Sequence, residues 1–102
     1  MDACKQTHKA LCVYGELKRM KTAGGEKTQA FVAQVSAALA LLTMKEQHVV
    51  QNLYIMQMTQ EEAAEALDCD VSTIARRKRR VIDRLALHLY PDEYLRENGL
   101  HM

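Results

Sequence analysis

Five basic residues stand in a row at positions 76–80, in the order Arg-Arg-Lys-Arg-Arg. A guanidinium group keeps its charge and donates hydrogen bonds in a fixed fork, so it suits phosphate and carboxylate partners. The whole chain has a formal net charge of only +1, so the run does not simply reflect a basic composition. It is a solvated helix face, a nuclear import tag or a surface that binds a polyanion, and the surrounding residues decide among these.

A second set of reactive side chains, Cys4, His8 and Cys12, recurs every four residues. On one helix the two sulfurs would lie about 12 Å apart along the axis. Zinc is usually held by tetrahedral ligands from two chain segments, so we expect no metal site here, and no cofactor. Adjacent carboxylates such as Glu61 and Glu62 face different directions on a helix. Because no nucleophile has a base and an orienting group at a recognisable spacing, the sequence predicts no enzyme.

The composition is typical of one small helical domain. The chain has 102 residues, of which 48% are hydrophobic and 26% are charged, with a single proline and few aromatic residues. An odd number of cysteines and an N-terminus without an apolar core favour reduced thiols in the cytoplasm. The most apolar segment, residues 30–42, is too short for a membrane span, which needs about 20 residues. We therefore expect an all-α cytoplasmic protein that is not inserted in a membrane.

The N-terminal part is predicted to form two helices separated by Gly24 and Gly25. The first, over residues 3–22, is amphipathic. Its apolar residues are Ala10, Val13, Tyr14, Leu17 and Met20. The second, over residues 27–42, is apolar on most sides, and such a helix has to be covered over most of its surface. It is either central to the domain or half of a dimer interface, so a homodimer through residues 3–42 is a further expectation.

Two capping boxes mark the starts of the next two helices. In a capping box a Thr side chain accepts from the amide three residues on, and a Glu at that position accepts from the amide of the Thr. Thr43 with Glu46 has this spacing, and so has Thr59 with Glu62. The helices that they open are predicted over residues 44–56 and 60–67.

A long basic helix closes the predicted set. Asp70 is placed to cap it, and it extends over residues 71–89. Pro91 ends this helix, because proline has no amide hydrogen and disfavours helix in the residue before it. The tail after Pro91 is expected to add one or two turns.

The last two helices have the features of a helix-turn-helix, in which a short turn joins two helices that cross closely. The shorter helix offers small side chains for the crossing, namely Ala63, Ala64 and Ala66. Leu67 would fill the core at its end. The longer helix has an inward apolar stripe of Ile74, Val81, Leu85 and Leu89. We therefore predict a small all-α domain with a C-terminal helix-turn-helix.

Charge is separated sharply between these two helices. Residues 71–89 contain six basic residues and one acid, whereas residues 59–70 contain five acids and no basic residue. A strongly cationic helix suits a polyanion, which it binds with release of counterions. Of the three interpretations of the basic run, this pattern favours the binding surface.

The segment LTMKEQHVVQNLYIMQMTQEEAAEALDCDVSTIARRKRRVIDRLALHL resembles region 4 of the sigma-70 family and its stand-alone relatives. These include small phage and prophage transcription regulators of the ArpU type and, more distantly, the LuxR-type DNA-binding domain. The resemblance covers about residues 39–89. The matching positions are Glu62, Ala64 and Leu67, then Thr73, Ile74, Arg77, Arg80, Val81 and Leu85. Gln47 departs from the family, which usually has Arg there, and residues 1–38 match no known pattern.

This resemblance implies a sequence-specific transcription regulator that binds double-stranded DNA with the helix 71–89 in the major groove. Residues 1–25 would then be an N-terminal helix and break, and residues 26–90 the DNA-binding domain. Within it the helix-turn-helix covers residues 59–89, and residues 91–102 form a short tail. The alternative is a co-regulator that binds RNA polymerase or a sigma factor and has little DNA affinity of its own.

Site residues are also implied by the resemblance. The outer face of the long helix carries Val71 and the four expected base contacts, which are Ser72, Ala75, Arg76 and Arg79. The expected phosphate contacts are Thr59, Thr73, Arg77, Lys78 and Arg80. Arg77 has a second interpretation, because its spacing from Ile74 and Val81 also lets its stem lie along the core.

Overall fold

The structure is a computed structural model that describes residues 2–20 and 24–99. Over these ranges it contains six α-helices, one π-helix and no strand, which confirms the all-α prediction. The helices are α1 (Ala3–Met20), α2 (Glu26–Leu39), α3 (Met44–Val50), η1 (Gln51–Ile55, the π-helix), α4 (Gln60–Ala66), α5 (Val71–Leu89) and α6 (Pro91–Glu97). None of the described helices combines the length and the apolar character needed to cross a membrane.

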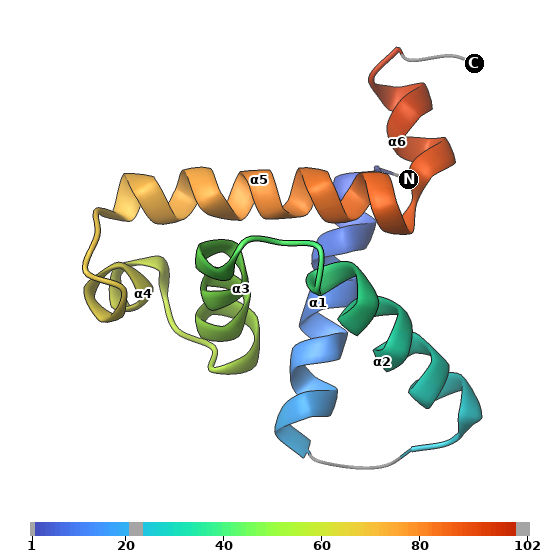
Figure 1. Ribbon diagram of the computed structural model, residues 1–102, viewed down its shortest axis with the longest axis horizontal. Coiled ribbons are helices and arrows are strands. Elements are labelled where there is room, and N and C mark those ends of the chain that lie inside the picture. The colour runs from blue at the N-terminus through green and yellow to red at the C-terminus, as the bar shows by residue number, and fades with distance from the viewer. Residues whose placement is uncertain (1, 21–23, 100–102) are drawn as a thin grey trace.

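The long helix α5 forms one edge of the molecule, as Figure 1 shows. α3 and α4 lie beneath its N-terminal half, and α1 and α2 diverge from beneath its C-terminal half. α6 turns away from the end of α5 and lies close to the start of α1. The main core therefore fills the space that α1, α2, α3, η1 and α5 enclose. Its buried residues are Leu11, Tyr14, Val35, Ala38, Leu42, Val50, Tyr54, Val81 and Leu85.

The helix α2 lies at the margin of this core. Only Val35 and Ala38 of its residues are buried, and Phe31, Val32 and Leu39 are partly buried against the core. The helix also ends at Leu39, three residues earlier than predicted, because residues 40–42 form the turn that leads into α3. Of the two predicted places for this helix, the central one is therefore wrong, and dimerisation through residues 3–42 stays a prediction.

The buried face of α1 differs from the predicted one. Val13 and Met20 are 48% and 59% exposed, although both belong to the predicted apolar stripe. The buried residues of this helix are Ala3, Thr7, Ala10, Leu11, Tyr14 and Gly15. Thr7 is tolerated inside because its hydroxyl donates to the Ala3 carbonyl at 2.8 Å. The helix ends at Met20, and the last two positions of the predicted helix lie outside the described residues.

Both predicted capping boxes are confirmed. The Thr43 amide donates to Glu46 Oε1 at 2.9 Å, and the Glu46 amide donates back to Thr43 Oγ1 at 3.2 Å. The second box has the same form, with distances of 2.9 and 3.1 Å between Thr59 and Glu62. The hydrogen bond from the Thr59 amide, followed by that from its hydroxyl, lowers the pKa of Glu62. These boxes fix the starts of α3 and α4.

The start of α5 is different. Asp70 occupies the N-cap position, but its side chain makes no capping hydrogen bond, so the predicted side-chain cap is wrong. The backbone carbonyl of Asp70 accepts instead from the amides of Thr73 and Ile74, at 3.0 and 3.2 Å. The bounds of α5 nevertheless agree with the prediction.

A π-helix interrupts the helix predicted over residues 44–56. From Gln51 to Ile55 the turns are wider, and the Met56 amide donates to the Gln51 carbonyl, five residues back, at 2.9 Å. The carbonyl of Tyr54 in this turn faces α1 at Gly15. Arg19 of α1 donates from Nη1 to this carbonyl at 2.7 Å and to the Ile55 carbonyl at 3.0 Å. The close approach to α1 thus satisfies two carbonyls that the end of η1 leaves free.

Gly15 is the residue that allows this approach, and replacing it tests the contact. A Cβ atom at position 15 would lie 2.0 Å from the Tyr54 carbonyl oxygen. Helix propensity alone predicts that Gly15→Ala stabilises the protein by about 1 kcal/mol. We expect the opposite, a loss of about 2 kcal/mol, because α1 has to move away from η1. Urea unfolding followed by circular dichroism measures the change.

The control for this prediction is Gly25→Ala. A Cβ atom there meets nothing within 4 Å, so the free energy of unfolding should change by about 1 kcal/mol or less. If Gly15→Ala stabilised the protein, the close contact between α1 and η1 would be contradicted.

Candidate nucleic-acid interface

α4 and α5 pack against α3 through a small cluster of their own. Its buried residues are Val49, Ala63, Ala64 and Ile74. Leu53, Met58, Leu67 and Cys69 are partly buried around it. Two of the three alanines predicted at the helix crossing are therefore confirmed, but Ala66 is exposed and takes no part in it. The crossing of α4 and α5 rests on Ala63 and Ala64.

The turn between α4 and α5 has a defined hydrogen-bonded geometry. Asp68 adopts a left-handed conformation with φ of 53°. The Cys69 amide donates to the Ala64 carbonyl at 2.9 Å, and the Asp68 amide donates to the Glu65 carbonyl at 3.3 Å. These two bonds are the Schellman motif that ends many helices. The motif fixes the direction in which the chain enters α5, and so helps to set the angle between the two helices.

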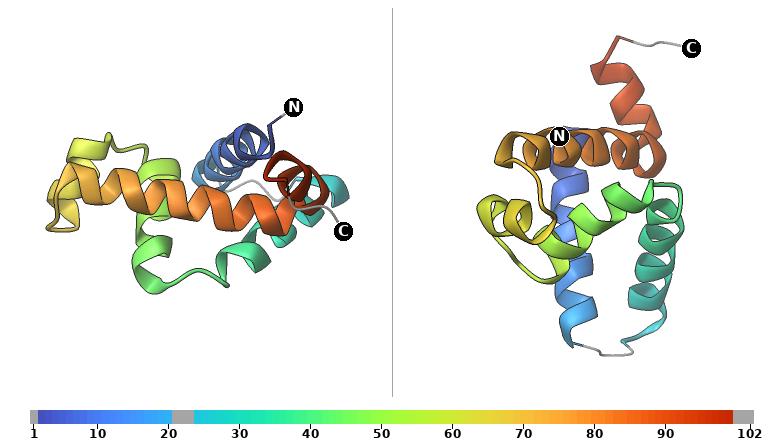
Figure 2. Two further views of the ribbon diagram at one scale, coloured as in Figure 1. Left: turned by 90° about the horizontal axis from the view of Figure 1, so that it is seen from above. Right: turned by 60° about the vertical axis from the view of Figure 1, so that its left-hand side comes forward.

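α5 is divided into a packed half and an open half. In its C-terminal half Val81, Leu85 and Ala86 are buried, and the helix contacts α1, α2 and α6. In residues 71–80 only Ile74 is buried. Seen from above in Figure 2, no other described helix lies over this N-terminal half on the side opposite α3 and α4. The predicted apolar stripe is confirmed at Ile74, Val81 and Leu85, and Leu89 packs partly buried against the core.

All four predicted base contacts lie on the open half of α5. Ser72, Ala75, Arg76 and Arg79 are exposed, and their spacing places them on one side of the helix. Ala75, Arg76 and Arg79 line an open hollow that continues along the helix past Arg80. The Arg76 Nη2 atom donates to the Thr73 hydroxyl at 3.3 Å, which holds this guanidinium close to the helix surface. The structure thus brings together the residues that the sequence selected.

The predicted phosphate contacts flank this face on both sides. Thr59 and Arg80 are exposed, whereas Thr73, Arg77 and Lys78 are partly buried. A second open hollow lies between the start of α4 and the side of α5, and Lys78 belongs to it. Its lining is Cys4, Gln60, Ala75, Lys78, Arg79, Ile82 and Asp83. Gln60 was not among the predicted phosphate contacts, although it lines this hollow. Gln60 directly follows Thr59, the capping residue of α4, and this position in the sequence indicates a side chain at the start of that helix.

The basic residues of the open half of α5 form no ion pair with acids among the described residues. Within residues 2–20 and 24–99 the ion pair is that of Arg84 with Glu46, and no residue of positions 76–80 makes one. The acids of the helix-turn-helix are exposed, but they lie on α4 and in the turn. They are Glu61, Glu62, Glu65, Asp68 and Asp70. The open half of α5 is therefore cationic, and its neighbour α4 is anionic.

One acid interrupts the basic face of α5. Asp83 follows Arg79 by one helical turn and lines both hollows. The Cys4 thiol donates to Asp83 Oδ1 at 3.5 Å, and burial, followed by this bond, raises the pKa of Cys4 to about 11. The Ala3 amide donates to Glu97 Oε1 of α6 at 2.9 Å. The start of α1 and the end of α6 are thus fastened together beside Asp83, where the open face ends.

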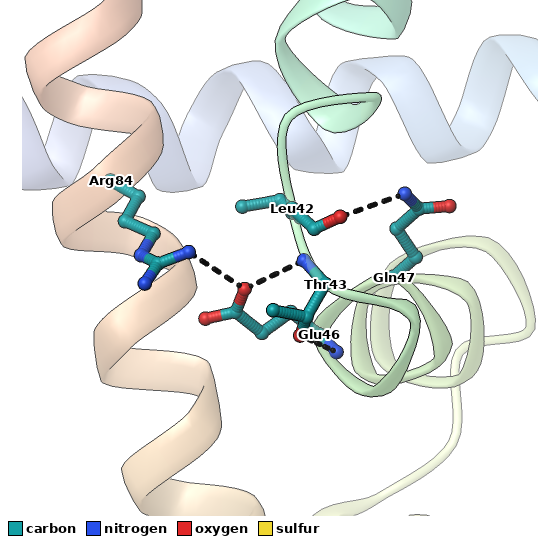
Figure 3. A network of polar contacts seen from close by, with 5 residues as sticks. All are labelled: Leu42, Thr43, Glu46, Gln47 and Arg84. Atoms are coloured by element: carbon teal, nitrogen blue, oxygen red, sulfur yellow. Dashed lines mark hydrogen bonds and ion pairs between the residues drawn. The ribbon is translucent and has the colours of Figure 1, made fainter.

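A polar network joins α5 to the start of α3, and Figure 3 shows its residues. Glu46 is only 3% exposed, and its Oε1 accepts both from the Thr43 amide and from Arg84 Nη1, the latter at 3.2 Å. Its Oε2 is buried without a hydrogen-bond partner among the described residues. Gln47 donates to the Leu42 carbonyl at 3.1 Å. Arg84 therefore supplies the positive charge for a buried carboxylate and fixes α3 against α5.

Comparison with known proteins gives one match. Residues 38–86, a little under half of the chain, match the protein-family model described as Sigma-70, region 4. This segment extends from the end of α2 to the buried part of α5 and includes α3, η1 and α4. It is a sigma-70 region 4-like helix-turn-helix. No curated protein and no solved structure matches the chain.

Replacing Arg84 tests whether the network supports the helix-turn-helix. Arg84→Met keeps the apolar stem but removes the guanidinium, so the buried Glu46 carboxylate loses its charged partner. We expect the free energy of unfolding to fall by about 1–3 kcal/mol. Urea unfolding provides the measurement.

The matched control is Arg80→Met, which removes a charge from the same helix without breaking an ion pair. Its effect should stay within about 0.5 kcal/mol. Adding Glu46→Gln to Arg84→Met should restore part of the loss, because no unpaired charge then remains buried. Equal losses in the two arginine variants would contradict the role of Arg84.

Proposed function

We propose that the protein binds double-stranded DNA through the open half of α5 and regulates transcription in this way. The observation that carries the proposal is the cationic face of residues 71–80, which is exposed and makes no internal ion pair on a helix-turn-helix of the region 4 type. A helix-turn-helix places its second helix in the major groove, with the N-terminal residues at the base edges. The exposed half of α5 is the half that this geometry requires.

The four residues at the centre of the face have suitable chemistry for reading bases. Arg76 and Arg79 are long enough to pair bidentately with guanine, the commonest specific contact in the major groove. Ala75 exposes a methyl group, which suits the methyl group of thymine. Ser72 offers a hydroxyl that can donate or accept. Together these four residues present two guanidinium groups, one methyl group and one hydroxyl.

Residues on both sides of this surface suit phosphates. The Thr59 hydroxyl is exposed at the start of α4, where its hydrogen could turn from the Glu62 carboxylate to a phosphate oxygen. Gln60 and Lys78 lie on the same side, around the second hollow. Arg80 and Thr73 lie on the other side of α5, and Arg77 is partly buried beside the core. Such contacts would hold the register of the helix without reading sequence.

The acidic surface of α4 restricts how a duplex approaches. Glu61, Glu65 and Asp68 are exposed and would repel phosphates, whereas the face of α5 attracts them. A duplex is therefore directed onto one side of the helix-turn-helix. A DNA ligand also implies a location in the compartment that holds DNA, and the kinship with small phage and prophage regulators remains part of this proposal.

A protein-interaction role is the second candidate, and one feature favours it. Leu41, Met44 and Leu87 are large apolar residues that stand exposed near the junction of α2, α3 and α5. Leu41 and Leu87 line a hollow together with Arg84 and His88. This surface would suit RNA polymerase or a sigma factor, the partners in the alternative interpretation. It lies on the packed half of α5, so it is compatible with DNA binding by the open half.

The double substitution of Arg76 and Arg79 by alanine tests the base readers. Duplexes that the wild-type protein enriches from a random-sequence pool are compared with an unrelated duplex of equal length, at about 150 mM salt. Each lost bidentate contact should cost about 1–3 kcal/mol, so the ratio of specific to non-specific affinity should fall by at least tenfold. Fluorescence anisotropy measures both affinities.

Arg80→Ala is the contrasting variant, because it should weaken binding to both duplexes by the same factor. An unchanged affinity ratio in the double variant would refute the assignment of base readers. If the wild-type protein retained no duplex at all and co-purified with RNA polymerase, the protein-interaction role would replace DNA binding.

Replacing Asp83 tests the proposal by a change that should raise the affinity for DNA instead of lowering it. Asp83→Asn removes the only acid of α5 but keeps an oxygen that can accept from Cys4. We expect affinity for every duplex to rise by up to about fivefold, because a charge interaction in a high dielectric is worth about 1 kcal/mol or less. Glu26→Gln, at the far end of α2, should leave the affinity unchanged. A weaker complex with Asp83→Asn would contradict a purely repulsive role of this carboxylate.

A further inference from the structure

The side chains of Cys12, His8 and Tyr54 contact one another in sequence where α1 meets η1. Cys12 Sγ lies 3.7 Å from His8 Nε2, within hydrogen-bonding distance for sulfur. The other nitrogen of the same ring, Nδ1, lies 2.8 Å from the hydroxyl oxygen of Tyr54. Cys12 and His8 are exposed, whereas Tyr54 is 6% exposed and belongs to the core. A thiol, an imidazole and a hydroxyl are thus contributed by two different helices.

Tyr54 is held firmly in this position. It lies in the π-helix, and its carbonyl is fixed by Arg19 and by the close approach of Gly15. Its ring meets the imidazole of His8 edge-on, with centroids 5.4 Å apart and planes inclined by 66°. The orientation of His8 is therefore set by a residue that the main core keeps in place.

The hydroxyl of Tyr54 determines which nitrogen of His8 carries the hydrogen. Burial, followed by the nearby charge of Cys12, raises the pKa of Tyr54, so its hydroxyl keeps its proton and donates to Nδ1. The hydrogen of the neutral imidazole then lies on Nε2, which faces Cys12 Sγ. A thiolate formed at Cys12 would accept that hydrogen bond. His8 therefore stabilises the thiolate as a hydrogen-bond donor, and its Nε2 is not free to accept the Cys12 proton.

The other two cysteines lack such an environment. The Cys4 thiol donates to a carboxylate, Asp83, and its pKa is raised to about 11 by burial and by this bond. Cys69 is partly buried against the cluster between α4 and α5. All three are free thiols, but only Cys12 is both exposed and paired with an imidazole.

We propose that Cys12 is a modification site at which the protein undergoes thiol–disulfide exchange with small-molecule disulfides, with His8 and Tyr54 as positioning residues. The Cys12 proton is lost to water, and the thiolate, which accepts a hydrogen bond from His8 Nε2, attacks one sulfur of the disulfide. A new S–S bond forms at Cys12, the old S–S bond breaks, and the second half of the reagent leaves as a thiolate. The disulfide is the oxidant, and no other co-reactant is required. This proposal does not depend on DNA binding.

The test uses full-length variants that keep one cysteine each, and the aromatic disulfide dithiobis(nitrobenzoic acid) as the probe. The variant with only Cys12 should react as fast as the most reactive thiol of the wild-type protein. The variant with only Cys4 should react about tenfold more slowly, because its raised pKa leaves less thiolate than its greater nucleophilicity restores. Mass spectrometry of the briefly treated wild-type protein should locate the adduct at Cys12.

The positioning residues are tested in the variant that keeps only Cys12. Tyr54→Phe should slow the exchange about fivefold, the effect of losing one hydrogen bond of ordinary strength. His8→Asn should slow it by at least as much and should change the shape of the pH–rate profile. His48→Asn, which changes another exposed histidine on α3, should do neither. Because His8 is exposed, its variant keeps the test valid even if Tyr54→Phe unfolds the protein.

Two results would overturn the proposal. One is an adduct that forms first at Cys69 or Cys4 in the wild-type protein. The other is an exchange rate and pH profile at Cys12 that His8→Asn leaves unchanged, since the thiol would then react as an isolated surface cysteine.

Discussion

The packing of a single helix, α5, is the constraint on which the structure depends. Every other described α-helix contacts it, and its buried stripe joins two apolar clusters. Ile74 belongs to the cluster beneath the helix-turn-helix, and Val81 and Leu85 belong to the main core. Because these residues lie on one face of a continuous helix, the proposed DNA-binding surface and the core that supports it cannot move independently. A shift of α1 or α2 against Leu85 would be transmitted to Arg76.

Charge and burial are divided along the same helix. Among the described residues, the cations of the open half have no acidic partner, and solvent stabilises their charge. The packed half carries Arg84, which pairs with the buried Glu46. An exposed ion pair contributes little, but a buried carboxylate that loses its partner is costly, so Arg84 matters for stability although its neighbours on the open half need not. The basic residues of α5 therefore differ in role according to what lies opposite each of them.

The sequence predicted features that depend on near neighbours in the chain. Both capping boxes, the bounds of α5 and its apolar stripe rest on residues within a few positions of each other, and they are confirmed. The buried face of α1, the exposure of Ala66 and the π-helix at Gln51 depend on contacts between distant segments, and they were not foreseen. The same reason explains why the sequence places Cys12 and His8 on one face of a helix, whereas it gives no sign of Tyr54, which is 46 positions from His8.

The helix α1 lies outside the segment that matches the Sigma-70, region 4 family model, yet it completes the core of that segment. Leu11 and Tyr14 pack in the same cluster as Tyr54, Val81 and Leu85, all of which belong to the matched residues. Without α1 these three apolar side chains would face water, and burial of a large apolar side chain is worth about 1.5–3 kcal/mol. The N-terminal helix therefore supports the helix-turn-helix from below. A substitution or modification at the α1–η1 contact, including one at Cys12, His8 or Tyr54, therefore acts on the helices that hold α5 in place.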